Sequence, residues 1–272
     1  MNKELANNLA QIINYGVYNN IDIDTILNNI FNSLTSFEGI SSNLKIEDVC
    51  DELETRKGSA NKNNDVTLYR KGINDSIEEE LSNAPFLSEQ EVNMFKVTYY
   101  VKTLIHELQH VKLKQAKENG IDTIETSILK LIDTNPKSVN SLAYQLCYDS
   151  NPEERMVELY AFKSITDVLE PFEEEYQNLF KLINKEYLLE KFYNYYEYGL
   201  NGPTTQYLSF FIDNKKLKEF NKDLKEKNLS TEERVYYGLK ISKSEYTSLV
   251  EEYSLLDDEL KSLSENTNKK NQ

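Results

Sequence analysis

The sequence has few residues of several types, and each shortage limits the kinds of metal site that the protein can form. Its 272 residues include two histidines, two cysteines and no tryptophan. Cys50 and Cys147 are far apart in the sequence and form no metal-type pair such as Cys-x-x-Cys. Buried, unreactive thiols are expected at both positions. A metal site built from three histidines is excluded.

Basic charge and long apolar runs are also scarce. The net charge of -15 and the isoelectric point near 4.7 argue against binding to nucleic acid or to an anionic membrane, since both require a basic surface. No segment approaches the run of about 18 apolar residues that a membrane-spanning helix needs. The first fifteen residues lack the apolar core of a secretory signal, so a cytoplasmic location is expected.

Glycine and proline are rare, with eight and five residues, while 39% of the residues are hydrophobic and 28% are charged. This composition is typical of a globular chain with a sizeable core. Apolar residues recur at helical spacing along most of the chain, and residues 65–70 form the best strand candidate. We therefore expect an α+β fold that is predominantly α-helical, with a small β-sheet and a helical C-terminal region.

Helical spacing and helix-end signals also predict where the elements lie. Helices are expected over two segments of 1–35 separated near Asn19–Asn20, then over 41–53, 89–118, 124–132, 152–169, 171–198, 204–212, 214–227, 231–240 and 244–264. Residues 58–64 are expected to form a loop, and residues 266–272 a frayed tail. The glycines and proline of 199–203 predict a boundary, with one domain over 1–200 and a helical region over 201–272.

The two histidines lie four residues apart in the sequence His106-Glu107-Leu108-Gln109-His110. Four residues are slightly more than one helical turn, so His106 and His110 project from one face of a helix and can bind one metal ion. The carboxylate of Glu107 is offset from this face and can instead reach a water molecule bound to the metal. This arrangement suits metal-assisted hydrolysis, with Glu107 as the general base.

The helix that carries the histidines has clear ends. Ser88 and Glu91 form a capping box at its start, and Gly120 is the expected stop. An apolar stripe beside the histidines indicates that the helix lies in a core; it comprises Val97, Val101, Leu104, Ile105, Leu108 and Val111. The alternative is a surface helix with two solvated histidines.

A catalytic zinc ion usually has three protein ligands and one open position, so a carboxylate must complete this set. The best candidates lie on the helix expected after Asn151 and Pro152, which favour a helix start. Glu154 and Glu158 lie four residues apart on one face of that helix. One can bind the metal while the other accepts a hydrogen bond from a ligating histidine.

The motif His106-Glu107-x-x-His110, followed by Glu154-x-x-Val157-Glu158, resembles that of the gluzincin branch of the zinc metallopeptidases. The resemblance covers about residues 103–162 and implies a zincin-like catalytic core that binds Zn²⁺. It implies Glu154 as the third ligand and Glu158 as the carboxylate that orients the first histidine. Val157 stands where the family usually has a smaller residue. An alternative register makes Glu158 the ligand and Ala161 the small residue.

The resemblance also implies an activity, which is hydrolysis of peptide bonds by a zinc-bound water that Glu107 activates. The expected partner is a peptide or protein substrate. A tyrosine would stabilise the oxyanion, and the candidates are Tyr144, Tyr148, Tyr160 and those within 193–198. The strand at 66–70 is a candidate for the edge strand that pairs with substrate.

Two other functions remain open at this stage. The long helical C-terminal region would suit an interaction protein that keeps a zinc-binding peptidase fold without turnover. A metal-free helical scaffold is the third possibility, and it would contain no zinc after purification from metal-replete medium.

Overall fold

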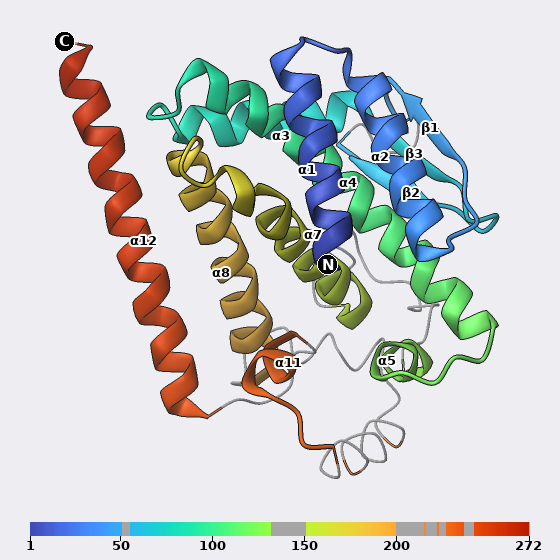
Figure 1. The fold of residues 1–272 in the computed structure, drawn as a ribbon. Coiled ribbons are helices and arrows are strands. Elements are labelled where there is room, and N and C mark those ends of the chain that lie inside the picture. The colour runs from blue at the N-terminus through green and yellow to red at the C-terminus, as the bar shows by residue number, and fades with distance from the viewer. Residues whose placement is uncertain are drawn as a thin grey trace. The chain divides into compact units, whose positions relative to one another are not determined.

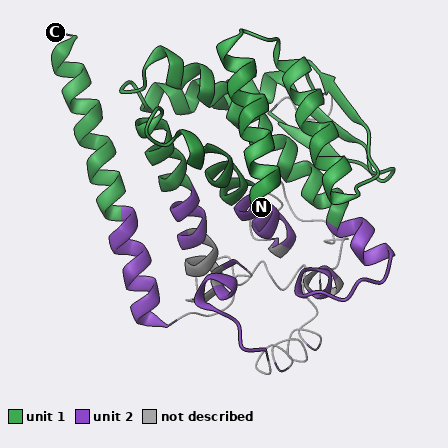
Figure 2. Cartoon of the chain, viewed as in Figure 1, with its two compact units in different colours: residues 1–112, 161–186, 254–272 green, residues 113–160, 187–253 purple. Residues whose placement is uncertain are grey.

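A computed structural model describes residues 1–50, 55–131, 151–199, 227–236 and 242–271, together with residues 215 and 222. These residues fall into two compact units, which Figure 2 shows in different colours. Unit 1 comprises residues 1–112, 161–186 and 254–272, and unit 2 comprises residues 113–160 and 187–253. The expected boundary near residue 200 stays a prediction.

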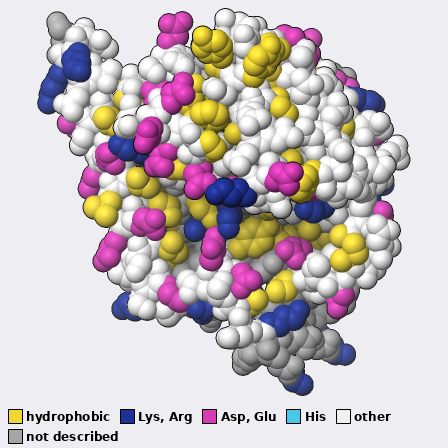
Figure 3. All heavy atoms as spheres, in the orientation of Figure 1, with side chains coloured by type: hydrophobic (Ala, Val, Ile, Leu, Met, Phe, Trp, Pro, Cys, Tyr) yellow, Lys and Arg dark blue, Asp and Glu magenta, His cyan; other side chains and the backbone are white. Residues whose placement is uncertain are grey.

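The fold is α+β and mostly helical, as the sequence predicted (Figure 1). The α-helices are α1 (Lys3–Tyr18), α2 (Ile23–Glu38), α3 (Arg70–Asn83), α4 (Glu89–Glu118), α5 (Ile124–Leu131), α7 (Pro152–Leu169), α8 (Gln177–Gly199), α11 (Thr231–Tyr236) and α12 (Lys243–Lys270). Among the described residues, no helix combines the length and the apolar character needed to cross a bilayer. Acidic and basic side chains are interspersed over the face drawn in Figure 3.

A three-stranded sheet belongs to unit 1 and has the strand order β1-β3-β2. Strand β3 (Val66–Tyr69) pairs in parallel with β1 (Leu44–Glu47), where Leu44 lies opposite Val66. It pairs antiparallel with β2 (Gly58–Ala60), where Gly58 lies opposite Leu68. Val66 and Leu68 are fully buried, so the predicted strand at 65–70 is confirmed and forms the centre of the sheet.

This sheet corrects three expectations. Residues 44–47 of the predicted helix over 41–53 form β1, because Leu44 and Ile46 alternate with exposed residues and pair with β3. The predicted loop over 58–64 begins with β2. In the described sheet β3 has a partner on each side, so it is not the edge strand that was expected to meet substrate. β1 and β2 hold the two edges.

Helix α4 begins and ends where the sequence predicted. The backbone N–H of Ser88 donates to Oε2 of Glu91 at 2.9 Å, and the N–H of Glu91 donates to Oγ of Ser88 at 3.3 Å. At the other end Gly120 takes the left-handed conformation, with φ of +67°, and the next N–H, of Ile121, donates to the carbonyl of Ala116. These caps fix a 30-residue helix.

Later elements agree with the predictions in part. Helix α7 spans 152–169 as predicted, but α8 begins at Gln177 and not at Pro171, which lies in a short 3-10 turn (Glu170–Phe172). Helix α12 continues through the predicted frayed tail to Lys270. The predicted helix over 204–212, most of that over 214–227 and the turn at 200–203 lie outside the described residues. Of the helix over 231–240, residues 231–236 are seen as α11.

Each unit has its own core. In unit 1 the largest side chains that are almost fully buried come from α1, α2, β3, α3 and α4; they are Leu5, Leu9, Ile13, Ile26, Leu27, Ile30, Leu68, Ile73, Met94 and Leu104. Cys50 is buried too, as predicted, while Cys147 lies outside the described residues. The core of unit 2 includes a cluster of Leu113, Leu129, Met156 and Val157, against which Ile124 and Tyr236 pack.

The Glu91 carboxylate stabilises two helix starts at once. Its Oε2 accepts from Ser88 at the start of α4, and its Oε1 accepts the N–H groups of Asn178 and Leu179 in the first turn of α8, at 3.0 and 3.3 Å. We expect Glu91→Ala to lower the free energy of unfolding by about 2 kcal/mol, because three buried or half-buried N–H groups lose their acceptor. Urea denaturation measures this change.

The matched control is Glu89→Ala, which removes an exposed carboxylate from the same helical turn. It loses only its favourable interaction with the helix dipole and should change stability by less than about 0.5 kcal/mol. Equal effects of the two substitutions would contradict the double capping role of Glu91.

Candidate metal site

The two histidines of α4 point their rings toward one another. Nε2 of His110 lies 3.2 Å from Nε2 of His106, and the ring centroids are 5.0 Å apart at an interplanar angle of 69°. Both side chains are half-buried, so the alternative of two fully solvated histidines is excluded. Five of the six apolar residues predicted to flank them are buried, among them Leu104, Ile105 and Leu108, while Val97 is half-buried.

The separation of these two nitrogens matches that of two ligands of one metal ion. Zinc–nitrogen bonds of about 2.05 Å at a tetrahedral angle place two nitrogens about 3.3 Å apart. A direct hydrogen bond between neutral imidazoles would also fit 3.2 Å, with one ring as donor and the other as acceptor. A third possible ligand beside the two histidines favours metal binding over this hydrogen bond.

That third donor is Glu154, in the first turn of α7. Asn151 precedes the helix and its Oδ1 accepts the N–H of Glu153 at 2.9 Å, while its carbonyl accepts the N–H of Arg155. The local sequence therefore starts the helix here, as predicted. Glu154 is half-buried and its Oε2 atom is buried.

Two contacts with α7 lie on either side of the histidines along α4. Within unit 2, Leu113 shares a core cluster with Met156 and Val157, so the helical turn after His110 is fixed beside the first turns of α7. Within unit 1, the ammonium of Lys102 lies 4.1 Å from the centroid of the Phe162 ring. Glu154 lies two residues before Met156, outside the stretch of α7 between these contacts, so its position beside the histidines is shown by the cluster itself.

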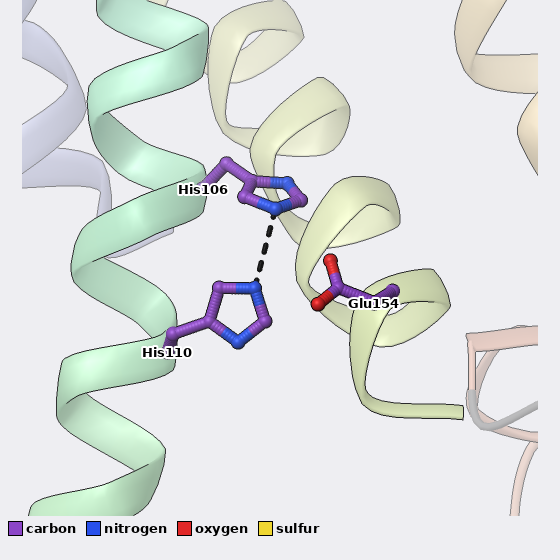
Figure 4. Close-up of side chains that lie close together, drawn as sticks. All are labelled: His106, His110 and Glu154. Atoms are coloured by element: carbon purple, nitrogen blue, oxygen red, sulfur yellow. Dashed lines mark hydrogen bonds between the residues drawn. The ribbon is translucent and has the colours of Figure 1, made fainter. Parts of the chain in front are cut away.

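The structure thus brings His106, His110 and Glu154 together (Figure 4). One ligand atom of each residue lies within 4.8 Å of the others. To reach tetrahedral spacing, the carboxylate would have to approach by at most about 1.5 Å, which side-chain rotation can supply. Two imidazole nitrogens and one carboxylate oxygen are a donor set that suits zinc. The cluster can hold a metal ion.

Glu158, the other carboxylate predicted on α7, is not a member of this cluster. It lies one turn further along the helix and is half-buried. The geometry therefore supports the register with Glu154 as the ligand. The predicted role of Glu158 in orienting a histidine stays a prediction.

Glu107 follows the first histidine and is 8% exposed. Its carboxylate lies against Gly58 in β2, since a Cβ built on that glycine would be 2.7 Å from Oε1 and 2.8 Å from Cγ. The absence of a side chain at position 58 therefore makes room for the Glu107 carboxylate. Sequence reasoning missed Gly58, because nothing local in the expected loop pointed toward a helix fifty residues later.

The predicted oxyanion tyrosine is not identified. Tyr144 and Tyr148 lie outside the described residues, and no side chain within 193–198 is described. Tyr160 is half-buried on α7.

Comparison of this chain with protein-family models, with curated proteins and with solved structures finds no match. The reading of the site therefore depends on its own geometry and chemistry.

Removal of each carboxylate tests the ligand set. We expect Glu154→Ala to weaken zinc binding by more than about 100-fold, because one of three ligands is lost, and Glu158→Ala by about tenfold or less. His106→Ala and His110→Ala should also abolish stoichiometric binding. Competition with a fluorescent chelator measures the affinity.

The matched control is Glu153→Ala, which removes the neighbouring carboxylate in the same turn, and circular dichroism checks the helix content of every variant. A greater loss of affinity in Glu158→Ala than in Glu154→Ala would favour the alternative register.

Proposed function

We propose that this protein is a zinc-dependent metallopeptidase with a zincin-like core. His106, His110 and Glu154 would bind the metal, and Glu107 would be the general base. The observation that carries the proposal is the convergence of these three donors next to the buried Glu107. The donor set matches the metal-site chemistry that the sequence motif implies.

Zinc bound by these residues would lower the pKa of a water ligand and polarise the carbonyl of a substrate. Glu107 would take the proton of the attacking water and later transfer it to the leaving amine. Its position one residue after His106 keeps it adjacent to the ligands, while its offset around the helix keeps it from binding the same ion. Burial against β2 limits the positions that its carboxylate can adopt.

A peptide is the proposed substrate because of the strand beside the base. Strand β2 lies on an edge of the described sheet, and its first residue, Gly58, contacts the Glu107 carboxylate. An extended peptide added to this edge would have main-chain hydrogen-bond partners and would pass close to the base. β2 thus takes the place that the sequence had suggested for β3.

Substitution of the base separates metal binding from catalysis. Glu107→Gln should lower the rate of peptide hydrolysis by more than about 100-fold while leaving close to one zinc per chain, since the ligands are untouched. Mass spectrometry of a peptide library measures cleavage, and elemental analysis measures zinc. Chelation of zinc from the wild-type protein should also abolish cleavage.

An active Glu107→Gln protein would rule out the proposed base. A wild-type protein that holds zinc but cleaves no peptide would instead favour the interaction protein with an inactive zincin-like fold.

Gly58 gives a test that substitutes neither a metal ligand nor the base. In Gly58→Ala the new Cβ would lie 2.7 Å from Oε1 of Glu107, so the carboxylate must shift. We expect kcat to fall by about tenfold or more, with zinc content unchanged and the melting temperature lowered by only a few degrees. Ser59→Ala, at the next position of β2, is the control and should retain activity. Wild-type kcat in Gly58→Ala would show that the position of this carboxylate is unimportant.

A further inference from the structure

Lys57 and Tyr99 form a pair of hydrogen-bond donors on the surface of unit 1. Nζ of Lys57 donates to the hydroxyl oxygen of Tyr99 at 3.0 Å and lies 5.5 Å from the ring centroid. The Tyr99 ring is held edge-on against Phe95, with centroids 5.8 Å apart. The lysine, although exposed, is therefore positioned by an aromatic side chain that is itself packed.

The pair keeps unused capacity to donate. The ammonium has three N–H groups and uses one on Tyr99, and the phenol accepts that bond without consuming its own proton. Within the described part of the chain, Lys57 makes no ion pair with a carboxylate. This is notable because acidic residues outnumber basic ones by 46 to 31. A neighbouring ammonium and phenol are suited to bind the two oxygens of one carboxylate.

Tyr99 lies on the same side of α4 as the candidate metal site. Tyr99 precedes His106 by seven residues, which places both within about 20° of each other around α4 and about 10 Å apart along it. Lys57 directly precedes Gly58, the residue that contacts the Glu107 carboxylate. Tyr99 is eight residues from Glu107, or about 12 Å along the helix.

A second cation lies beside the Tyr99 ring. Nζ of Lys102 lies 5.1 Å from the centroid of the Tyr99 ring. The carboxylate of Glu186 on α8 interacts electrostatically with Lys102. Burial raises the pKa of that carboxyl, and the nearby Glu80 raises it further.

We propose that Lys57 and Tyr99 form a subsite for a carboxylate of the substrate, supplied by an acidic side chain or by the peptide's C-terminus. The inference rests on the proposed peptidase function and adds a substrate class to it. An extended peptide advances about 3.4 Å per residue, so a separation of about 12 Å places the recognised carboxylate three or four residues from the bond that is cut.

Binding tests the subsite without turnover. The probes are fluorescein-labelled octapeptides with amidated C-termini that carry one Glu, or Gln at the same position, scanned along a neutral sequence. Anisotropy with the zinc-loaded Glu107→Gln protein should show about five- to tenfold tighter binding of the best Glu peptide than of its Gln partner. The same neutral peptide with a free C-terminus tests the terminal carboxylate. The preference should weaken as salt is raised.

Substitution then assigns the preference to the pair. Adding Lys57→Gln should remove the preference for Glu, and Tyr99→Phe should reduce it by about threefold, while binding of the neutral peptide stays unchanged. The matched control is Lys96→Gln, which removes the same charge from an exposed position elsewhere on α4. The subsite proposal is refuted if the Glu107→Gln protein shows no preference for the Glu peptide. It is also refuted if the preference remains after Lys57→Gln is added.

Cleavage by the wild-type protein separates the two proposals. Mass spectrometry of the same peptides should place the cut three or four residues from the Glu, with a higher kcat/KM than for the Gln partner. Equal cleavage of the Glu and Gln peptides would refute the subsite and leave the peptidase. A Lys57-dependent binding preference without any cleavage would refute the peptidase and leave a carboxylate-binding site.

Discussion

The candidate site depends on the helical repeat of one long, firmly capped helix. Because α4 completes a turn every 3.6 residues, His106 and His110 project together and their Nε2 atoms lie 3.2 Å apart. This spacing persists only while the backbone stays helical across the motif. The reciprocal bonds of Ser88 and Glu91 hold one end of α4, and the left-handed Gly120 closes the other. The site therefore derives its geometry from a rigid element and not from a loop.

The third ligand has a different origin, since a helical repeat cannot bring Glu154 to α4. Its approach depends on apolar packing between segments about forty residues apart in sequence, with Leu113 beside Met156 and Val157. Hydrophobic contacts of this kind are non-directional. They determine which face of α7 packs inward, but they do not determine which carboxylate binds the metal. The final choice between Glu154 and Glu158 follows from which carboxylate that face presents to the histidines.

Gly58, the first residue of β2, and Lys57, directly before it, complete the surroundings of the candidate site. Gly58 lets the carboxylate of Glu107 lie directly against β2, and the adjacent Lys57 reaches Tyr99 two helical turns before His106. Among the described residues Lys57 has no carboxylate partner, which is unusual for a surface cation in so acidic a chain. The start of β2 thus contributes to the candidate site through the side chain that Gly58 lacks, and the residue before the strand contributes Lys57.

The sequence alone determined the elements that are specified by neighbouring residues. The capping box and Gly120 predict both ends of α4, and Asn151 and Pro152 predict the start of α7. The spacing of His106 and His110 predicts that both project from one face of α4. All of these signals act between residues that are close in sequence. Only the tertiary structure decided that residues 44–47 and 58–60 are strands, since both need β3 as a partner, and that Gly58 meets Glu107. It also decided which glutamate joins the histidines, because long-range packing, which no local pattern encodes, sets that contact.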